Sequence, residues 1–546
     1  TRRFQTQPQT VKLDTICFEM KNSVLCLVVF VLMFRKISSH SFVSSKIALV
    51  QTRRLLDHGL ALRQWRSPHL LLYRGGASSS SENPAIPKFR VFLAVGSNLG
   101  DRFHNIMMAL DLLCDNGDHG TRFCRSSFLH QTSPMYVVDQ PAFLNGVVEI
   151  ETNLKRNALL GRVKWIEEKL GRDFSEVRNG PRPVDLDILF CDRIDGSSTV
   201  PVILDTPTLI VPHCLMQERD FVLSPLAEVA GSDYRHPVLN ATVGNLLDNL
   251  NLRKDAAMTQ VLCLPRGRLL RFEQTIVMGI LNVTPDSFSD GGMWSSSVAV
   301  AARHALKMAE QGAGIIDIGG ESTRPGAPET SAEEQIRRTI PVIQEIRKFS
   351  DIPISIDTRH SRVAKAAVEA GADIVNDVSG GTFDEDMFDT VAKLRVPIIL
   401  MHMRGNPESM QTMTEYDSVV DNVIESLHER SQAAESAGIP RWLQIIDPGI
   451  GFAKNFEGNL LLLKYLSRIR KELGYLPIVL GTSRKGFIGH ITGITSPEER
   501  DNGSLGSVIT ALCLGDGPLG CNIVRVHNVK GSKEALVVMD AIRTAQ

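Results

Sequence analysis

The second half of this sequence repeats a short apolar run followed by a helix-forming stretch, and this regularity constrains the fold more than any other feature. The strand-like runs lie at 276–283, 314–319, 353–357, 373–378, 396–402, 442–447, 477–482 and 522–527. Eight such units within about 270 residues match the usual size of a (β/α)8 TIM barrel. Because the carboxyl ends of barrel strands meet at one face and carry the active site, the pattern also predicts where a site lies.

A different order of elements precedes the barrel pattern. Strand-like runs lie at 90–95, 122–129, 143–152 and 184–190, and helical patterns lie at 101–114 and 155–170. The order β-α-β-β-α-β predicts a ferredoxin-like α+β sandwich. A chain of 546 residues is also too long for one ordinary domain. We therefore expect a first domain at 89–250, a linker at 251–271 and a barrel domain at 272–546.

Residues 1–88 have the composition of a leader rather than of a domain. Between residues 33 and 81, eight Lys and Arg residues accompany one acid, Asp57, and serines are abundant. A basic, serine-rich and acid-poor segment is typical of an organelle transit peptide, which predicts import into the mitochondrial matrix. The alternative is a disordered tail without an address on a cytosolic protein. The apolar run at 24–34 has 11 residues, too few to span a membrane.

Charge and cysteine content exclude several classes of protein. The 60 Lys and Arg residues are balanced by 61 Asp and Glu residues, so no global basic field favours nucleic acid as a partner. None of the nine cysteines forms a CxxC pair, so neither a zinc site nor a disulfide framework is predicted. Binding of phosphates therefore has to come from local sites.

One such site is indicated by the string VDLDILF, which begins at Val184. Side chains alternate along a strand, so Asp185 and Asp187 share one face and could hold Mg²⁺ together with phosphate oxygens. Arg182, His213 and Arg219 lie close in sequence and supply the cations that phosphoryl transfer requires. The sequence contains no P-loop motif. The alternative is an exposed strand face with two solvated acids.

A second site is indicated by polar residues at the ends of the barrel strands. Asp357, Asn376 and Asp447 could bond an amino-pyrimidinone edge. Groups suited to an anion are also present at strand ends, namely Asn282, Arg324, Arg525 and His527; the remaining polar residues at strand ends are Thr323, Lys454, Ser483 and Lys485. Each residue has an alternative role, such as a helix cap for Asp357, a turn for Asp447 or a surface charge for Lys485. The barrel fold would nevertheless bring them to one pocket.

Five strings in the first domain resemble the 6-hydroxymethyl-7,8-dihydropterin pyrophosphokinases: GSNLGDR (96–102), TSPMY (132–136), DQPAFLN (139–145), GPRPVDLDILF (180–190) and VPH (211–213). The resemblance covers residues 89–250. It implies that Asp185 and Asp187 bind two Mg²⁺ ions. It also implies that ATP contacts Glu167, Arg172, Arg182, His213 and Arg219, and that the pterin slot is formed by Thr132, Pro134, Phe143, Asn145 and Phe221.

In the barrel, the strings NVTPDSFSDGG (282–292) and GGESTRPG (319–326) are similar to those of dihydropteroate synthases. The resemblance covers residues 272–546 and implies three groups of site residues. The pterin would be held by Asp357, Asn376, Asp447 and Lys485; pyrophosphate by Asn282, Arg525 and His527, with Asn282 also a Mg²⁺ ligand; and p-aminobenzoate by Thr323, Arg324, Pro325 and Ser483. The residues expected to be catalytic are Arg182, Asp185, Asp187, Lys485, Arg525 and His527.

The two resemblances together are typical of the bifunctional folate-pathway enzymes of plant mitochondria. They imply pyrophosphorylation of the pterin by ATP with Mg²⁺, followed by condensation with p-aminobenzoate to give 7,8-dihydropteroate and pyrophosphate. Expected partners are these small molecules and a second copy of the barrel, with neither nucleic acid nor membrane. Two alternatives are a pterin-binding barrel like that of corrinoid-dependent methyltransferases, and a non-catalytic first domain beside an active barrel.

Overall fold

The computed structural model describes residues 88–114, 120–175, 179–250, 258–284, 294–322, 329–514 and 520–545. The expected leader lies outside these ranges except for Lys88, and so do Thr323, Arg324 and Pro325. Contacts group residues 83–546 into one compact unit, and every feature below belongs to it.

An antiparallel sheet forms the centre of the first domain. Its strand β1 (Phe89–Ser97) pairs with β4 (Phe143–Thr152) on one side and with β5 (Asp185–Asp195) on the other. The other elements that were predicted for this domain are β2 (Arg122–Ser126), β3 (Leu129–Thr132), α3 (Arg102–Leu113) and α4 (Arg156–Lys169). The predicted ferredoxin-like α+β fold is confirmed. The predicted run 122–129 is divided into β2 and β3, which both pair with β4.

Side-chain alternation along β1 explains how both faces of this sheet are covered. Val91 and Leu93 pack into the cluster that contains α3 and α4. Phe92 points to the opposite face and packs with α5 (Asp220–Ala230) and α6 (Val243–Asn249). The helix α5 follows a short extension made of β6 (Ser198–Pro201), β7 (Leu204–Asp205), β8 (Ile210–Val211) and the 3-10 helix η2 (Met216–Glu218).

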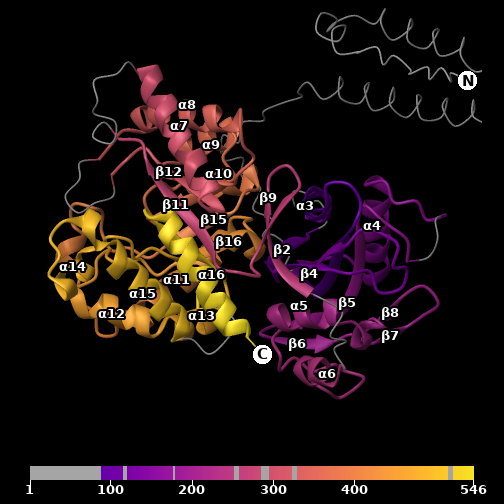
Figure 1. Ribbon diagram of the computed structural model, residues 1–546. Helices are drawn as coiled ribbons and strands as arrows, with labels where there is room; N and C mark the ends of the chain where they lie inside the picture. The colour runs from indigo at the N-terminus through magenta and orange to yellow at the C-terminus, as the bar shows by residue number, and fades with distance from the viewer. Residues whose placement is uncertain are drawn as a thin grey trace, which may run out of the picture. The chain divides into compact units, whose positions relative to one another are not determined.

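The second half of the chain is the predicted (β/α)8 barrel (Figure 1). Its parallel strands are β11 (Ile276–Asn282), β12 (Ile315–Gly319), β13 (Ile354–Asp357), β14 (Ile374–Asp377), β15 (Ile398–Met401), β16 (Gln444–Asp447), β17 (Val479–Leu480) and β18 (Ile523–Val526). A parallel bridge between Ile446 and Ile478 joins β16 to the segment that begins β17 and closes the ring. The strand interiors are buried, as their continuous apolar runs require.

Helices alternate with these strands and surround the barrel (Figure 1). They are α7 (Trp294–Glu310), α8 (Ala332–Arg347), α9 (Ser361–Ala370), α10 (Met387–Leu394), α11 (Val419–Ser436), α12 (Phe456–Lys464), α13 (Leu466–Glu472), α14 (Gly486–Thr492), α15 (Asp501–Cys513) and α16 (Val529–Thr544), with the 3-10 helices η4 (Met410–Thr412), η5 (Arg441–Leu443) and η6 (Pro497–Arg500). None of the helices that the structure describes is long and apolar enough to cross a membrane.

A β-hairpin lies where we expected the end of a linker. Its strands β9 (Met258–Leu264) and β10 (Arg268–Arg271) pair with each other, and β9 also pairs with β3 of the first domain. Leu262 and Leu264 pack against residues at the amino-terminal ends of nearly all the barrel strands, such as Met278 and Ile315. The hairpin therefore extends the first sheet and covers the floor of the barrel.

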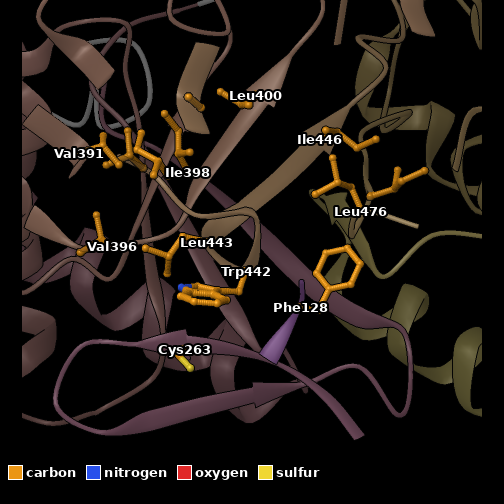
Figure 2. Close-up of a cluster of buried hydrophobic side chains, with 14 of the residues drawn as sticks. Phe128, Cys263, Val391, Val396, Ile398, Leu400, Trp442, Leu443, Ile446 and Leu476 are labelled. Atoms are coloured by element: carbon orange, nitrogen blue, oxygen red, sulfur yellow. The ribbon is translucent and has the colours of Figure 1, made fainter. Parts of the chain in front are cut away.

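The two domains also meet through a buried seam beside this hairpin. Figure 2 shows Phe128 of the first domain, Cys263 of β9 and Trp442 of η5 within one cluster of buried side chains. The guanidinium carbon of Arg441 lies 4.9 Å from the centroid of the Phe128 ring. The Arg441 backbone amide donates to Ser126 Oγ at 2.9 Å. Apolar packing and backbone hydrogen bonds thus join the domains directly.

Candidate active sites

A cavity of about 460 Å³ opens where the carboxyl end of β1 meets the amino ends of its antiparallel neighbours β4 and β5. Asp185 and Asp187 of β5 line it, whereas Leu186 and Ile188 between and after them are buried in the core. The two carboxylates therefore share one face, as strand alternation predicts. The other predicted residues that line this cavity are Thr132, Phe143, Asn145, Arg172, Arg182, His213, Arg219 and Phe221.

Cations converge on the two carboxylates. Arg172 and Arg182 approach Asp185 at 2.5 Å and 3.0 Å. His213 Nε2 and Arg219 Nη1 lie 3.9 Å and 3.8 Å from Asp187 Oδ2. This concentration of positive charge suits a polyphosphate, because phosphoryl transfer depends on cations around the phosphate oxygens.

The paired acids have opposite electrostatic environments. Burial raises the pKa of Asp185, but the guanidinium groups of Arg182 and Arg172 outweigh it, so the net shift is downward. Burial and the neighbouring charge of Asp185 raise the pKa of Asp187. Burial lowers the pKa of His213. The site therefore holds one firmly ionised carboxylate beside one that binds a proton more readily.

Aromatic and amide groups line the same cavity beside the charged residues. Asn145 Nδ2 donates to Thr132 Oγ1 at 2.8 Å, and both residues are buried. Gly96 of β1 lies against this pair, because a Cβ atom there would be 2.7 Å from Asn145 Oδ1. The rings of Phe143 and Phe221 provide flat apolar surfaces on which a pterin ring could stack.

Two predicted residues of this site lie outside the cavity wall. Pro134 is not among the residues that line it, although its neighbours Ser133 and Met135 are. Glu167 is fully buried behind the wall and accepts from Leu186 N at 2.8 Å. Glu167 also forms ion pairs with Arg172 and Lys164. Lys164 lines the cavity and was missed from the sequence, where one lysine on a helix carries no distinguishing signal.

A larger cavity of about 1080 Å³ lies at the carboxyl ends of the barrel strands. The predicted residues that line it are Asn282, Ser483, Lys485, Arg525 and His527. Ser483 Oγ lies 2.9 Å from His527 Nδ1 across two neighbouring strand ends. Asp357, Asn376 and Asp447 are almost fully buried and lie behind these cations.

Arg525 connects the cations of the wall to the buried acids. Its Nη2 donates to Asp357 Oδ2 at 2.7 Å, and its Nε donates to Asp317 Oδ2 at 2.6 Å. Asp317 also accepts from Asn376 Nδ2 at 3.3 Å. Asp317 was missed from the sequence, although an acid inside the run IIDIG is itself a signal, since a buried charge requires a partner.

Lys485 and Asp447 form the other charged group of this site. Burial lowers the pKa of Lys485 to about 8, and the charge of Asp447 opposes that shift. Burial also raises the pKa of Asp447. The Lys485 amine donates to the Ile450 carbonyl and lies 4.7 Å from the centroid of the Phe452 ring. Lysine and aspartate thus hold the segment that carries Phe452 against the cavity.

Lys454, which the sequence also places near this face, lines the same cavity although its side chain is almost fully buried. Its amine lies 2.8 Å from His402 Nδ1 and donates to the Phe452 carbonyl at 2.8 Å. It therefore fixes the segment that carries Phe452 from within the cavity wall. Among the residues that the structure describes, three or more His, Cys, Asp or Glu side chains never cluster as a metal cage.

Two known protein families match this chain, one over each domain. Residues 92–231 match the family described as 7,8-dihydro-6-hydroxymethylpterin-pyrophosphokinase, and residues 278–527 match the family described as pterin binding enzyme. A solved structure of Xanthomonas albilineans dihydropteroate synthase with 4-aminobenzoic acid is 44% identical to the part it matches. That match covers 51% of this chain and 97% of the other, with a TM-score of 0.47.

Two plant relatives match across both domains. The mitochondrial folate synthesis bifunctional protein of Pisum sativum is 42% identical over 478 residues, covering 83% of this chain and 89% of its own length. The folate synthesis bifunctional protein of Arabidopsis thaliana is 41% identical over 484 residues, covering 83% and 96%. With two family matches in order and relatives of this extent, the chain belongs to the bifunctional folate synthesis proteins, enzymes that join a dihydropterin pyrophosphokinase to a dihydropteroate synthase.

Proposed function

We propose that the first domain transfers a diphosphate from ATP to 6-hydroxymethyl-7,8-dihydropterin, and that the barrel condenses the product with p-aminobenzoate. The observation that carries this proposal is the pairing of opposite charges at the barrel strand ends. Buried acids that can hydrogen-bond to a pterin lie directly behind Arg525, and Arg525 has the charge to bind a departing diphosphate. A site that bound a pterin without a leaving group would not need that cation.

In the first site, we propose that Asn145 and Thr132 bond the pterin edge while Phe143 and Phe221 stack on its faces. Arg182, Arg219 and His213 would bind the phosphates of ATP, with Arg172 near the same acids. The pterin hydroxyl oxygen then attacks the β-phosphorus of ATP and loses its proton to solvent, the bond between that phosphorus and the oxygen bridging to the α-phosphate breaks, and AMP leaves. The arginines stabilise the charge that spreads over the phosphate oxygens during this step.

Mg²⁺ fits the chemistry of the donor set in this site. Asp185 and Asp187 present two carboxylates on one face beside a cationic cavity. Mg²⁺ prefers one or two protein carboxylates, completing its shell with phosphate oxygens and water. When bound, it would neutralise charge on the transferred diphosphate. In the barrel, the side-chain oxygen of Asn282 is the candidate Mg²⁺ ligand beside the pyrophosphate.

In the barrel site, we propose that Asp357, Asn376, Asp447 and Lys485 hold the pterin. Arg525 and His527 would grip pyrophosphate as the bond between its oxygen and the pterin methylene breaks. A guanidinium has five N–H donors, so Arg525 can bond an anion while keeping its two carboxylate partners. The amine of p-aminobenzoate then forms the new C–N bond and releases a proton to solvent. Ser483, with Thr323, Arg324 and Pro325, is proposed for the p-aminobenzoate side.

Three further expectations remain part of this proposal. Residues 89–250 and 272–546 would be the two catalytic domains, and residues 1–88 would direct the protein to mitochondria, because two of the plant relatives are named as mitochondrial proteins. The barrel would form a homo-oligomer, a proposal that the exposed apolar side chains Val538 and Ile542 of α16 support.

The test is coupled turnover by the purified protein. With ATP, Mg²⁺, hydroxymethyl dihydropterin and p-aminobenzoate, the wild-type chain should produce dihydropteroate. Asp187→Asn keeps the shape of the side chain and removes its charge, so pyrophosphokinase activity should fall by about two orders of magnitude. Synthesis from preformed pterin pyrophosphate should be unchanged in the same variant.

Asp195→Asn is the matched control, because Asp195 ends the same strand and its side chain is 69% exposed. It should leave both activities intact. Full pyrophosphokinase activity in Asp187→Asn would show that the first site is assigned wrongly. Pterin binding without pyrophosphate release would instead favour a non-synthase barrel.

A further inference from the structure

One buried carboxylate inside the barrel is joined to both halves of the synthase site. Asp317 lies in β12 and is fully buried, between Ile280 of β11 and Ser355 of β13 in register. Its two partners are Arg525 and Asn376, which come from strands β18 and β14. The chemistry proposed above assigns the first to the anion and the second to the pterin, and gives Asp317 no part.

We propose that Asp317 is a positioning residue for the synthase reaction, one that holds the Arg525 guanidinium and the Asn376 amide in the geometry that binds pterin pyrophosphate. The inference rests on the proposed function of the barrel. It goes further by naming the residue that couples its two halves.

The effect on Arg525 follows from the two edges at which its guanidinium is held. Nε donates to Asp317 at 2.6 Å, and Nη2 donates to Asp357 at 2.7 Å. Two anchors on a rigid planar group fix both its position and its plane. With a hydrogen bond to Asp357 alone, the guanidinium could rotate about that one contact. Its remaining N–H groups would then no longer point at the diphosphate.

The effect on Asn376 follows from hydrogen-bond polarity. An ionised carboxylate only accepts, so the Asn376 amide has to turn its NH₂ group toward Asp317. Both Asp317 oxygens lie within reach of that group, at 3.4 Å and 3.3 Å. The other side of the amide then presents one defined set of donor and acceptor atoms to the pterin. In Asp317→Asn the side chain at 317 can donate as well as accept. The Asn376 amide could then flip, and its donor and acceptor atoms would no longer face the pterin in one fixed order.

Asp317 also influences the acid that contacts the pterin. Burial raises the pKa of Asp357 to about 7; Arg525 lowers it, and the charges of Asp317, Glu321 and Asp377 raise it. Asp317 and Asp357 compete for one cation. Removing the Asp317 charge therefore lowers the pKa of Asp357, whereas weakening Arg525 raises it, and these opposite directions supply the test.

The experiment compares Asp317→Asn with wild type in the full chain, using preformed pterin pyrophosphate and p-aminobenzoate. We expect kcat/KM for pterin pyrophosphate to fall about 100-fold, with little change in KM for p-aminobenzoate. The acid limb of the pH profile should move down by on the order of one pH unit. Arg525→Lys, which cannot bond both carboxylates, should move the same limb upward and keeps the proposal testable if Asp317→Asn does not fold.

Ser355→Ala is the matched control, because Ser355 is the buried register neighbour of Asp317 and its Oγ has no hydrogen-bond partner in the described part of the chain. It should behave like wild type, and the pyrophosphokinase activity of every variant reports that the chain has folded. Unchanged kinetics in Asp317→Asn, or lost activity with an unmoved acid limb, would overturn the proposal. Failure of the wild-type chain to form dihydropteroate would contradict the proposed function instead.

Discussion

At the scale of single residues, Lys485 is the group whose protonation most directly affects the barrel site. Its pKa is lowered to about 8 by burial, and the charge of Asp447 limits that shift. The ammonium is therefore lost within an accessible pH range. We expect kcat/KM for pterin pyrophosphate to decline above about pH 8, and the decline should begin at lower pH in Asp447→Asn, because the neutral amide no longer supports the ammonium.

Lys454 provides the control for this alkaline limb. It is also buried near Asp447, and its pKa is lowered to about 7. If deprotonation of Lys485 causes the alkaline decline in kcat/KM, Lys454→Met should leave the pH of that decline unchanged even if the rate falls. A limb that disappears in Lys454→Met would assign the titration to Lys454 instead of Lys485.

Individual site residues could be predicted where local geometry alone determines their direction. Asp185 and Asp187 share a face because strand side chains alternate, and Arg525 and His527 lie together because both are at the carboxyl end of β18. Glu167 was predicted as an ATP contact, but the structure places it behind the wall, a position set by the packing of α4 on β5. The acid of the run IIDIG marks Asp317 as a buried charge that needs a partner, but its partners Arg525 and Asn376 come from strands far apart in sequence, which no local pattern reveals.

At the scale of elements, the hairpin β9–β10 attaches to the barrel through one buried acid. Asp373 precedes β14 and is fully buried. Arg266, Arg268 and Arg347 all form ion pairs with it. Asp373→Asn would leave these cations without their counter-charge, so it should destabilise the barrel by about 3–5 kcal/mol. Urea denaturation followed by Trp442 fluorescence would measure the loss.

Asp351→Asn is the comparison for this variant, since Asp351 lies near the same arginines but is exposed. Its effect should stay within about 0.5 kcal/mol. Equal effects of the two substitutions would mean that the arginines are held by packing rather than by the buried charge.

The eight barrel strands could be predicted because each repeats the same short apolar run, and closure follows from their number. The hairpin could not, although two apolar stretches flank Pro265, Arg266 and Gly267. Arg266 and Gly267 both adopt the left-handed backbone typical of tight hairpin turns. Within the described residues, the hairpin is held by β3 and by the barrel floor, which are distant in sequence, so the segment by itself resembles an irregular connection.

At the scale of the whole molecule, the described residues of the two domains meet across a seam with one glutamate on each side. Glu228 of α5 accepts from Phe128 N at 2.7 Å, and Glu435 of α11 accepts from Ser126 N at 3.3 Å. The two amides lie at the end of β2 and just before β3. Burial raises the pKa of each glutamate to about 7. The two domains are therefore joined by buried contacts as well as by the chain that connects them.

The raised pKa values predict how the joined structure responds to pH. In the unfolded chain these carboxyls titrate near 4.3, so between about pH 4.3 and 7 the folded protein holds protons that the unfolded chain has released. Their contribution to stability is complete below that window and is lost as pH rises through 7.

The double variant Glu228→Gln/Glu435→Gln keeps an acceptor oxygen at each position but cannot ionise. Its thermal midpoint should therefore exceed that of wild type at pH 8, with the difference shrinking toward pH 5. Glu151→Gln, at a surface ion pair with Arg122, should show no such trend. A difference between double variant and wild type that is constant with pH would mean that the seam carboxyls are ionised in the folded protein.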